Sequence, residues 1–190
     1  MGMKGNLSDS ELALRCARKD SEAQSELYTR YAGRLYAVCF RYIGEREDAQ
    51  DLMHDAMIKA MESIGSFHYN GEGSLYAWLR RLAVNVSIDR LRELGRYQTV
   101  SLDSTMEAIV SEPQDEDDVD SIPAQVMLDM IAALPDVRRT VFNMYCIDGF
   151  SHKDIAAAIG ITEKGSASIL AKARTQLKNA INEYLKRTGR

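Results

Sequence analysis

Proline is scarce in this 190-residue chain: there are three, and none precedes Pro113. Because proline breaks helix interiors, and no clear period-two alternation occurs, the residues before Pro113 are predicted to be helical. No apolar run approaches the about 18 residues needed to cross a bilayer. The first residues also lack the apolar core of a signal peptide, so a cytoplasmic protein is expected.

Cysteine is equally sparse. Cys16, Cys39 and Cys146 lie far apart, with no Cys-x-x-Cys pair and no histidine at zinc-ligand spacing. This argues against a disulfide framework and a structural zinc site, and we expect no metal, no cofactor and three buried or half-buried thiols. The chain is 45% apolar and 27% charged, as in ordinary globular proteins. Its length suits one ordinary domain or two small ones.

Charge is unevenly distributed along the chain. The formal net charge is −4, but residues 97–123 contain eight Asp and Glu and no Lys or Arg. Setting these eight negative charges aside leaves +4 for the remainder. From Lys164 to the end, seven basic residues face a single acid, Glu183. That C-terminal segment is therefore a candidate polyanion-binding element, despite the acidic average.

Residues 6–96 are predicted to form a compact helical bundle. Helices are expected at residues 8–19, from 21 to Gly44, at 46–63 and from 74 onward. Ser21 and Gln24 have the spacing of a capping box, and Ser74 can cap the last of these helices. Trp78 lies on the apolar stripe of that helix and is expected in the core.

Residues 97–123 lack helical periodicity and contain two of the three prolines. Such a segment cannot bury enough apolar surface to offset the cost of ordering, so it is predicted to be a flexible acidic linker. Helical patterning resumes over residues 124–187. The expected fold class is therefore all-α, with two small helical domains joined by this linker.

The second domain has the spacing of a helix-turn-helix unit. Ser151 and Asp154 form a capping-box pattern before an apolar run. Gly160 then stops that helix, and Thr162 can cap the next. The second helix would bury Ile169, Leu170, Ala173 and Leu177 and expose Lys164, Ser168, Lys172 and Thr175. Exposed polar positions of this kind can reach phosphates and base edges in a major groove.

A helical hairpin with a solvated basic face is the alternative, since charge on an exposed helix is the default. Lys153, in the first turn of the leading helix, is either a phosphate contact or an ordinary surface lysine. The spacing alone leaves both readings open.

Three carboxylates, Asp48, Asp51 and Asp55, are spaced to share one face of a helix. They could be a metal or acid-base site, but no histidine or second carboxylate cluster joins them by sequence. A docking surface for a basic partner and simple solvation are the other two interpretations.

A loop rich in aromatic and amide side chains precedes the fourth helix, and basic residues follow it. The residues concerned are Phe67, His68, Tyr69, Asn70 and Ser74 in the loop region, then Arg80, Arg81 and Asn85. Rings and amides can hold an extruded base while arginine neutralises phosphate, so this segment is a candidate site for unpaired bases.

Several motifs together resemble bacterial sigma factors of the extracytoplasmic-function group of the sigma-70 family. The segments that carry the resemblance are residues 48–55, 67–85, 131–139 and 150–162, the last ahead of Ala173-Arg-Thr-Gln-Leu177. They cover nearly the whole chain outside the linker, in the order of the family. The combination is highly specific, although no single segment is.

The resemblance implies an initiation subunit, not an enzyme, with region 2 at residues 6–96 and region 4 at 124–187. Core RNA polymerase, through its largest-subunit clamp and its flap, and promoter DNA would be its partners, together with an anti-sigma factor that can be membrane-bound. The implied polymerase contacts are Asp48, Asp51, Leu52 and Asp55. The implied contacts to melted −10 DNA are the eight residues from Phe67 to Asn85 named above. The implied contacts to −35 duplex are Lys153, Lys164, Ser168, Lys172 and Arg174.

The start of the recognition helix departs from the family pattern. Many members have Thr-Val-Lys-Ser-Arg where this chain has Gly165-Ser-Ala-Ser-Ile169, a variant that resembles members from Bacteroidetes. Two basic side chains are lost, and Ser166 stands where an apolar residue usually packs. We therefore expect weak affinity from this helix alone, with a salt dependence flatter by at most about two units.

Two other classes of function remain open at this point. A dimeric helix-turn-helix regulator would bind a palindromic duplex without polymerase, leaving the acidic face and the aromatic loop without a role. A carboxylate-metal enzyme would use Asp48, Asp51 and Asp55 and would be stabilised by divalent ions.

Overall fold

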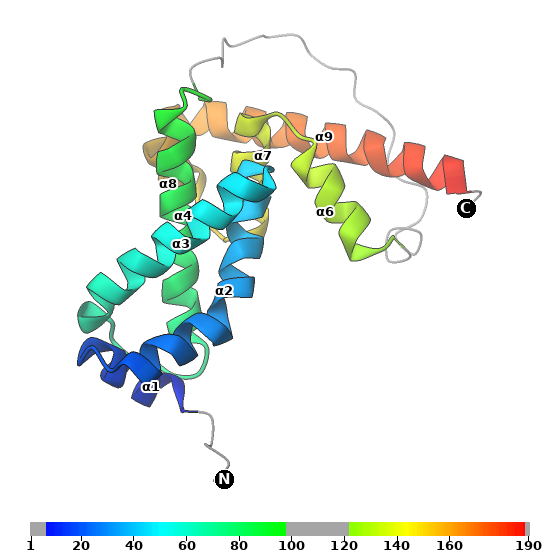
Figure 1. Cartoon of the computed structure of the whole chain (residues 1–190). Coiled ribbons are helices and arrows are strands. Elements are labelled where there is room, and N and C mark those ends of the chain that lie inside the picture. Colours follow the sequence, from blue (N-terminus) through cyan, green and yellow to red (C-terminus); the bar gives the residue numbers. More distant parts are fainter. Residues whose placement is uncertain (1–6, 98–121, 189–190) are drawn as a thin grey trace. The chain divides into compact units, whose positions relative to one another are not determined.

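The computed structural model describes residues 7–97 and 122–188, and every regular element in these ranges is a helix (Figure 1). The predicted all-α fold is confirmed. Of the described residues, those up to Ser87 form one compact unit and those from Ile88 form a second. Almost all of the predicted linker, 97–123, lies outside the described residues. Within the described ranges, no helix is both long and apolar enough to span a membrane.

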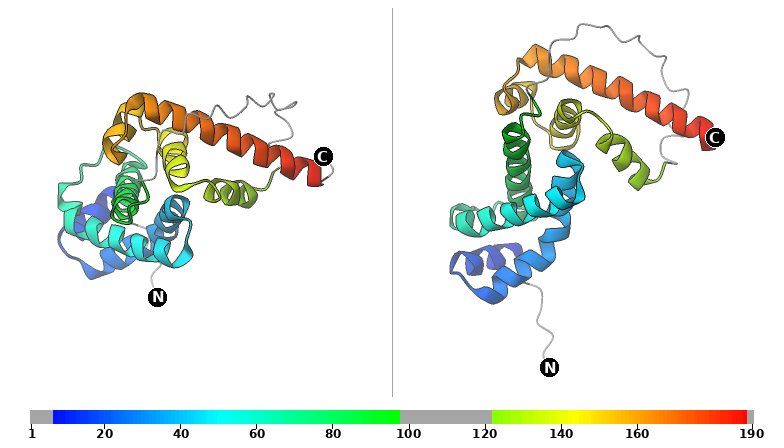
Figure 2. Two further views of the ribbon diagram at one scale, coloured as in Figure 1. Left: turned by 90° about the horizontal axis from the view of Figure 1, so that it is seen from above. Right: turned by 45° about the horizontal axis from the view of Figure 1, so that its top comes forward.

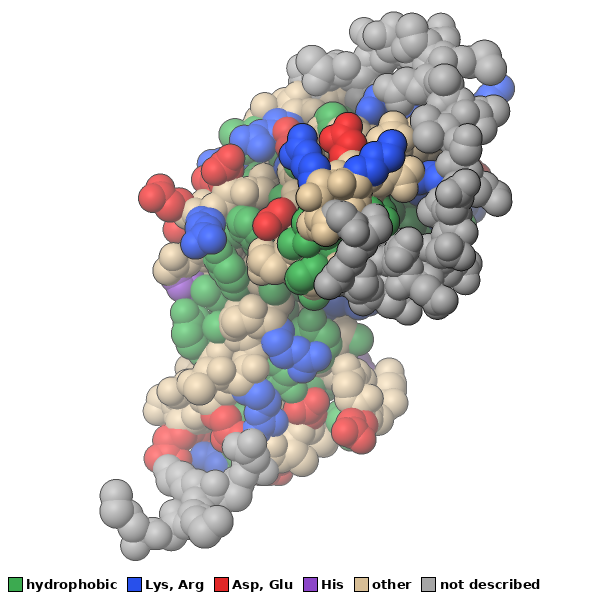
Figure 3. All heavy atoms as spheres, turned by 90° about the vertical axis from the view of Figure 1, so that its right-hand side faces the viewer, with side chains coloured by type: hydrophobic (Ala, Val, Ile, Leu, Met, Phe, Trp, Pro, Cys, Tyr) green, Lys and Arg blue, Asp and Glu red, His purple; other side chains and the backbone are tan. Residues whose placement is uncertain are grey.

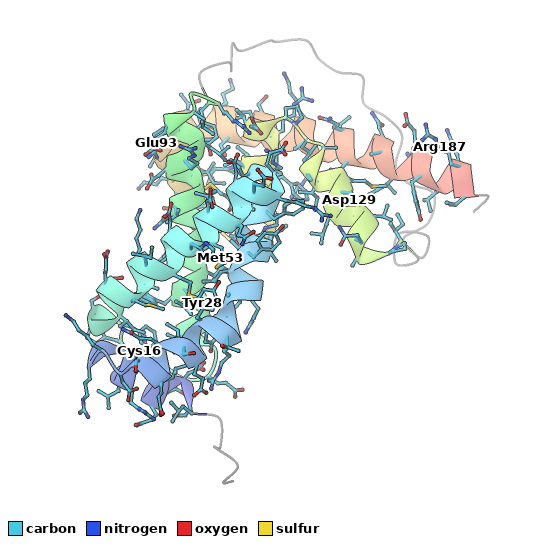
Figure 4. All side chains as sticks on the ribbon, in the orientation of Figure 1. Cys16, Tyr28, Met53, Glu93, Asp129 and Arg187 are labelled. Atoms are coloured by element: carbon cyan, nitrogen blue, oxygen red, sulfur yellow. The ribbon has the colours of Figure 1, made fainter. Side chains whose placement is uncertain are left out.

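The first unit contains four helices and one short turn. They are α1 (Asp9–Ala17), α2 (Ser21–Ile43), α3 (Arg46–Ser63), the 3₁₀ turn η1 (Ile64–Ser66) and most of α4 (Ser74–Glu93). The predicted helical stripe of α2 is buried: Leu27, Tyr31, Leu35, Val38 and Tyr42. This stripe packs on α3, near Tyr28 and Met53 in Figure 4. In Figure 2, α1 and the first half of α2 lie side by side in both views.

The start of α2 differs from the prediction in its capping residue. Ser21 is the first helical residue, and Asp20 is the cap: its Oδ1 accepts hydrogen bonds from the backbone N–H of Glu22 at 3.0 Å and Ala23 at 3.2 Å. Arg15 donates its Nε–H to the other carboxylate oxygen at 2.7 Å. The Arg15 hydrogen bond, followed by that from Ala23, lowers the pKa of Asp20. A charged cap satisfies two helix-end donors at once.

The second unit contains the end of α4 and five further helical elements. They are α6 (Ala124–Ala132), α7 (Asp136–Phe142), the π-helical turn η2 (Asn143–Ile147), α8 (His152–Ile159) and α9 (Glu163–Thr188). Four residues, Ile131, Leu134, Ala173 and Leu177, form a buried cluster between the end of α6, with the turn after it, and the middle of α9. Arg187 marks the C-terminal end of α9 in Figure 4.

One buried arginine holds the turn between α6 and α7. Arg139 donates to the carbonyl oxygens of Ala132 at 2.7 Å and Leu134 at 3.1 Å, and it pairs with the carboxylate of Asp136. Burial lowers the pKa of Arg139, with the Asp136 charge opposing that effect. Arg139 thus supplies hydrogen-bond donors to the carbonyl oxygens of the turn, which the chain reversal would otherwise leave without partners.

The helix-turn-helix signals are confirmed. Ser151 and Asp154 make both hydrogen bonds of the capping box at the start of α8. Gly160 ends that helix in the left-handed conformation, with φ of 73°. The hydroxyl of Thr162 accepts the backbone N–H of Gly165 at 3.0 Å and so caps α9. These local contacts fix the turn that separates α8 from α9.

Candidate nucleic-acid interface

The outer face of α3 is acidic. Asp51 and Asp55 are exposed and Asp48 is half-buried, as the spacing predicted, whereas Leu52 is only 4% exposed and packs inward. Basic and acidic side chains are interspersed on the face seen in Figure 3. On α3 itself, three carboxylates share one face, and Lys59, exposed four residues after Asp55, adds one positive charge beside them.

The same face of α3 carries an exposed hydrophobic side chain that sequence patterning did not single out. Ile58 is 55% exposed and lies between Asp55 and Glu62 at helical spacing. Beside it on the next turn, His54 Nε2 lies 3.1 Å from the hydroxyl of Tyr28 on α2. An apolar centre with a polar rim is the composition of many protein interfaces, and Ile58 supplies one apolar side chain among the charges of this face. Only its exposure, a tertiary property, distinguishes Ile58 from the buried residues of α3.

The loop between η1 and α4 is held by short-range hydrogen bonds. Ser74 was predicted to cap α4 but is its first residue, and its hydroxyl donates to the carbonyl oxygen of Gly71 at 2.7 Å. The hydroxyl oxygen of Ser74 accepts the backbone N–H of Asn70 at 3.3 Å. The His68 ring nitrogen Nδ1 lies 2.9 Å from the carbonyl oxygen of Ser66. Ser74 therefore orders the loop instead of the helix start.

The aromatic residues of this loop have two different environments. Phe67 packs on Trp78 of α4, with ring centroids 5.5 Å apart, and both rings are half-buried. Trp78, expected in the core, is thus half-buried, with the loop ring of Phe67 packed against it. Tyr69 is 47% exposed, and His68 and Asn70 are exposed beside it. These three side chains are available to a ligand.

The predicted polar residues of α4 lie on one accessible side. Arg81 and Asn85 are exposed and one turn apart, and Arg80 is half-buried on the adjoining face. Asp89, one turn beyond Asn85, pairs with Arg92 at 2.7 Å. Asp89 is thus paired with Arg92, and Asn85 lies next to Arg81 on the exposed side of α4.

An aromatic stack supports the start of α4 from behind. The rings of Tyr31 on α2 and Tyr76 on α4 are parallel within 12°, with centroids 6.2 Å apart. The guanidinium of Arg34 lies 3.4 Å from the Tyr76 ring centroid. Tyr31 donates its hydroxyl to Asp9 of α1 at 2.6 Å, and burial together with Asp9 raises the pKa of Tyr31 to about 12. The loop residues thus extend from a helix that is braced by two others.

The exposed face of α9 carries the predicted polar residues. Lys164, Ser168 and Arg174 are exposed and Lys172 is half-buried, while Lys153 is exposed on α8. The four predicted core residues of the opposite face, Ile169, Leu170, Ala173 and Leu177, are all buried. The helix therefore offers a basic face with an apolar back, as a groove-binding helix requires.

Two of the three cysteines are buried as predicted, and the third is not. Cys16 and Cys39 are buried, and burial raises the pKa of each thiol to about 11. Cys146 is exposed on η2, contrary to the expectation, and accepts a long contact from Arg174 at 3.8 Å. In residues 7–97 and 122–188, no three His, Cys, Asp or Glu side chains are grouped as a metal ion would need.

Two family models match this chain in sequence. Residues 27–97 match Sigma-70 region 2, and residues 124–177 match Sigma-70, region 4. The first match runs from within α2 to the end of α4, and the second runs from α6 to the middle of α9. Both therefore coincide with the surfaces described above.

Two curated sigma factors are similar to this chain over nearly the whole length of both proteins. The RNA polymerase sigma-H factor of Pseudomonas aeruginosa is 27% identical over 190 residues, covering 94% of this chain and 96% of that protein. The ECF RNA polymerase sigma-E factor of Haemophilus influenzae is 28% identical over 192 residues, covering 96% and 100%.

A solved structure, the sigma factor RpoE in complex with the anti-sigma factor NepR from Bartonella quintana, has a similar fold. Its TM-score is 0.50 at 22% sequence identity, over 83% of this chain and 96% of that one. The two family models span most of the chain in the order that the resemblance predicted. The chain therefore belongs to the sigma-70 family of RNA polymerase sigma factors, in its extracytoplasmic-function group.

Proposed function

We propose that the three surfaces divide the work of a sigma factor, which directs RNA polymerase to promoters. The acidic surface of α3 binds core polymerase, the loop before α4 with Arg81 and Asn85 holds melted −10 DNA, and α9 reads the −35 duplex. In this proposal residues 6–96 act as region 2, 97–123 as linker and 124–187 as region 4. The chain itself performs no covalent chemistry.

The observation that supports this division most strongly is the contrast in charge between α3 and α9. The stripe of carboxylates on α3 repels a polyanion, so its partner is a basic protein surface, with Ile58 as the apolar centre of the contact. Leu52 contributes from the buried side by fixing α3, because its side chain is too enclosed to reach a partner. The clamp of the polymerase is the partner that the family supplies.

The second surface suits an unpaired base. Exposed Tyr69 offers a ring for stacking, Asn70 and Asn85 offer amide groups, and Arg81 offers charge for the backbone. Duplex DNA would bury these groups poorly, because its bases are already stacked. Capture of an extruded base requires separated strands, and so places this loop on the melted −10 element.

The third surface suits duplex. Lys164, Lys172 and Arg174, with Lys153 on α8, can neutralise phosphates on either side of a major groove, while Ser168 reaches base edges. The start of α9 lacks two basic side chains of the family pattern, so we infer that this contact is weak alone and depends on polymerase to hold the helix near DNA.

We also infer an anti-sigma partner. The RpoE structure with similar fold contains the anti-sigma factor NepR. A partner of this class would cover the α3 surface and so compete with polymerase in the cytoplasm. Stand-alone regulation by a palindrome-binding dimer gains no support from the family of this chain.

Co-elution with bacterial core RNA polymerase tests the proposal. Wild-type protein should form a stoichiometric complex on size-exclusion chromatography, and Asp55→Lys should weaken that complex at least about tenfold, since a repulsive pair replaces a favourable one at the interface. Glu11→Lys on α1 makes the same charge change on an exposed residue outside the α3 surface. It should bind as wild type does.

Circular dichroism and thermal melting of both variants establish that they are folded. Wild-type binding by a folded Asp55→Lys protein would refute the assignment of α3. Equal losses in both variants would mean that total charge, and not the α3 surface, governs assembly.

A further inference from the structure

Ser166 is a polar residue at a fully buried position. It lies in the first turn of α9, where the family pattern has an apolar residue, and its side chain is 0% exposed. A buried hydroxyl is costly unless it forms a hydrogen bond. Its partner is His152, the first residue of α8, whose Nδ1 lies 2.9 Å from the Ser166 hydroxyl oxygen. The substitution of serine for an apolar residue therefore creates a direct bond between the two helices.

The His152 ring is itself fixed by a second contact. It stacks on the ring of Tyr145 in η2, with centroids 4.4 Å apart and planes inclined by 20°. Tyr145 is 37% exposed, and His152 is half-buried. Ser166, His152 and Tyr145 thus join α9, α8 and η2 in a continuous chain of contacts.

The same turn of η2 meets α9 at another point. The guanidinium of Arg174 lies 5.9 Å from the Tyr145 ring centroid, and its Nη2 lies 3.8 Å from the sulfur of Cys146. Ser166 and Arg174 are two turns apart, about 12 Å along the helix axis. Contacts at two separated points define the rotation of a helix about its axis, which one contact cannot.

Orientation of this kind matters for base reading. Apolar packing is non-directional and tolerates small rotations, whereas a hydrogen bond constrains both distance and angle. Binding groups must be held within about 0.5 Å and 10–20° to be effective. The start of α9 lacks two basic side chains of the family pattern, so its selectivity depends on the accurate placement of the polar residues that remain there.

We infer that Ser166, His152 and Tyr145 orient α9 for reading the −35 duplex, as positioning residues that do not touch DNA themselves. The inference rests on the proposed role of α9. It assigns a function to two residues, His152 and Tyr145, that sequence patterning passed over. It also explains how a serine is accommodated at an apolar position of the recognition helix.

A barcoded promoter library, randomised over the −10 and −35 elements and transcribed by reconstituted holoenzyme, tests this inference. The readout is the ratio of transcripts from preferred over non-preferred −35 sequences. Ser166→Ala removes the hydroxyl, and His152→Phe keeps a ring on Tyr145 without the hydrogen bond. Each variant should lower the −35 ratio about fivefold to tenfold, the effect of a lost buried hydrogen bond. Preference at −10 and binding to core polymerase should not change.

The matched control is Ser87→Ala. Ser87 is also 0% exposed, but it lies on α4, where its hydroxyl donates to the carbonyl oxygen of Ala83 at 2.8 Å and also interacts with the Cys39 thiol of α2, so both contacts lie within the first unit. This variant should keep the wild-type −35 ratio. An equal fall of the ratio in Ser87→Ala would overturn the inference, because the effect would then follow general stability.

The double variant Ser166→Ala with His152→Phe separates positioning from stability. Replacing both partners by apolar groups leaves no unpaired polar atom, so the melting temperature should return close to wild type. The −35 ratio should stay low, because the directional contact is absent. A ratio that recovers together with stability would overturn the inference.

The wild-type profile distinguishes the two levels of the argument. A wild-type holoenzyme without any −35 preference would refute the proposed role of α9, and the inference with it. A clear wild-type preference that Ser166→Ala leaves unchanged would overturn the inference alone.

Discussion

Two glycines determine the path of the loop that precedes α4. Gly71 and Gly73 have φ of 106° and 79°, in the left-handed region that side chains disfavour. Each is next to a candidate base-contacting segment, and Ser74 bonds to the carbonyl of Gly71 itself. Gly65, in η1, has no positive φ and open space at its Cβ. The loop geometry therefore depends on Gly71 and Gly73 and not on Gly65.

Gly71→Ala is expected to impair promoter opening. A side chain at this φ costs about 1–2 kcal/mol, and the loop would relieve that cost by displacing Tyr69 and Asn70. Permanganate reactivity of melted thymines should fall severalfold, while binding to core polymerase should remain at the wild-type level. Gly65→Ala is the control and should open promoters normally. Equal behaviour of the two variants would contradict the role given to the loop.

Asp20 makes the stability of the first unit depend on pH. Its pKa is lowered in the folded state, first by Arg15 and then by the Ala23 backbone N–H. The folded state thus favours the ionised carboxylate. This stabilisation is complete above the unfolded pKa of about 4, and it is lost as pH falls through the lower folded pKa.

Asp20→Asn should remove that dependence while preserving the cap, because asparagine caps helices well. The melting temperature of wild type should exceed that of the variant at pH 7, and the gap should close as pH falls below about 4. Thermal melts from pH 7 to pH 3 measure it. A gap that stays constant with pH would show that Arg15 does not act through the charge of Asp20.

At the scale of whole elements, α9 lacks two basic side chains of the family pattern, and the burial of the two positions decides which one could carry a charge. The two positions that lose basic side chains are Ala167 and Ile169. Ala167 is exposed, but Ile169 is 9% exposed and belongs to the apolar back of the helix. Only the first position can regain a phosphate contact without burying a charge.

Ala167→Lys is therefore expected to strengthen binding to duplex DNA. One added phosphate contact should steepen the dependence of log K on log salt by about 0.9. Fluorescence anisotropy with a random-sequence duplex, from 50 to 300 mM salt, measures the slope. Ala133→Lys, exposed at the end of α6, makes the same charge change away from this face and should leave the slope nearly unaltered. A steeper slope in both variants would refute the placement of α9 on DNA.

Most helix boundaries could be predicted because their signals are local. The ends of α3 at Arg46 and Ser63, and the left-handed stop of α8 at Gly160, follow from spacing and from one glycine. Asp20 was missed as the cap of α2 because Ser21 also fits a capping pattern, and only the contact with Arg15 distinguishes them. Local signals thus locate helices, while tertiary partners decide which cap is used.

The site was predictable to a different degree. The exposure of Asp51, Asp55 and Lys164 follows from helical periodicity. The exposure of Ile58 and the bond between Ser166 and His152 do not, since they depend on which helix faces are covered by neighbours. Charged surfaces could therefore be derived from the sequence, but the contacts that orient them could not.

For the whole molecule, the distribution of charge opposes the binding of free protein to DNA. The rest of the chain has a net charge of +4, and the eight acids of residues 97–123 lower the net charge of the whole chain to −4. Net negative charge repels a polyanion over a Debye length of about 8–10 Å or more, and salt screens that repulsion. The weak binding of α9 to DNA would then need polymerase, because the net negative charge of the free chain opposes it.

Replacing these eight acids by Asn and Gln should raise the affinity of the free chain for a random-sequence duplex. The increase should exceed about tenfold at 50 mM salt and shrink markedly by 300 mM, because the effect is long-range electrostatics. A variant with the order of residues 97–123 shuffled keeps every charge and should bind as weakly as wild type. If the shuffled chain gained affinity equally, a specific sequence in the segment, and not its charge, would be responsible. If neither gained, the basic surfaces of the free chain would be too weak to bind duplex even without the opposing charge.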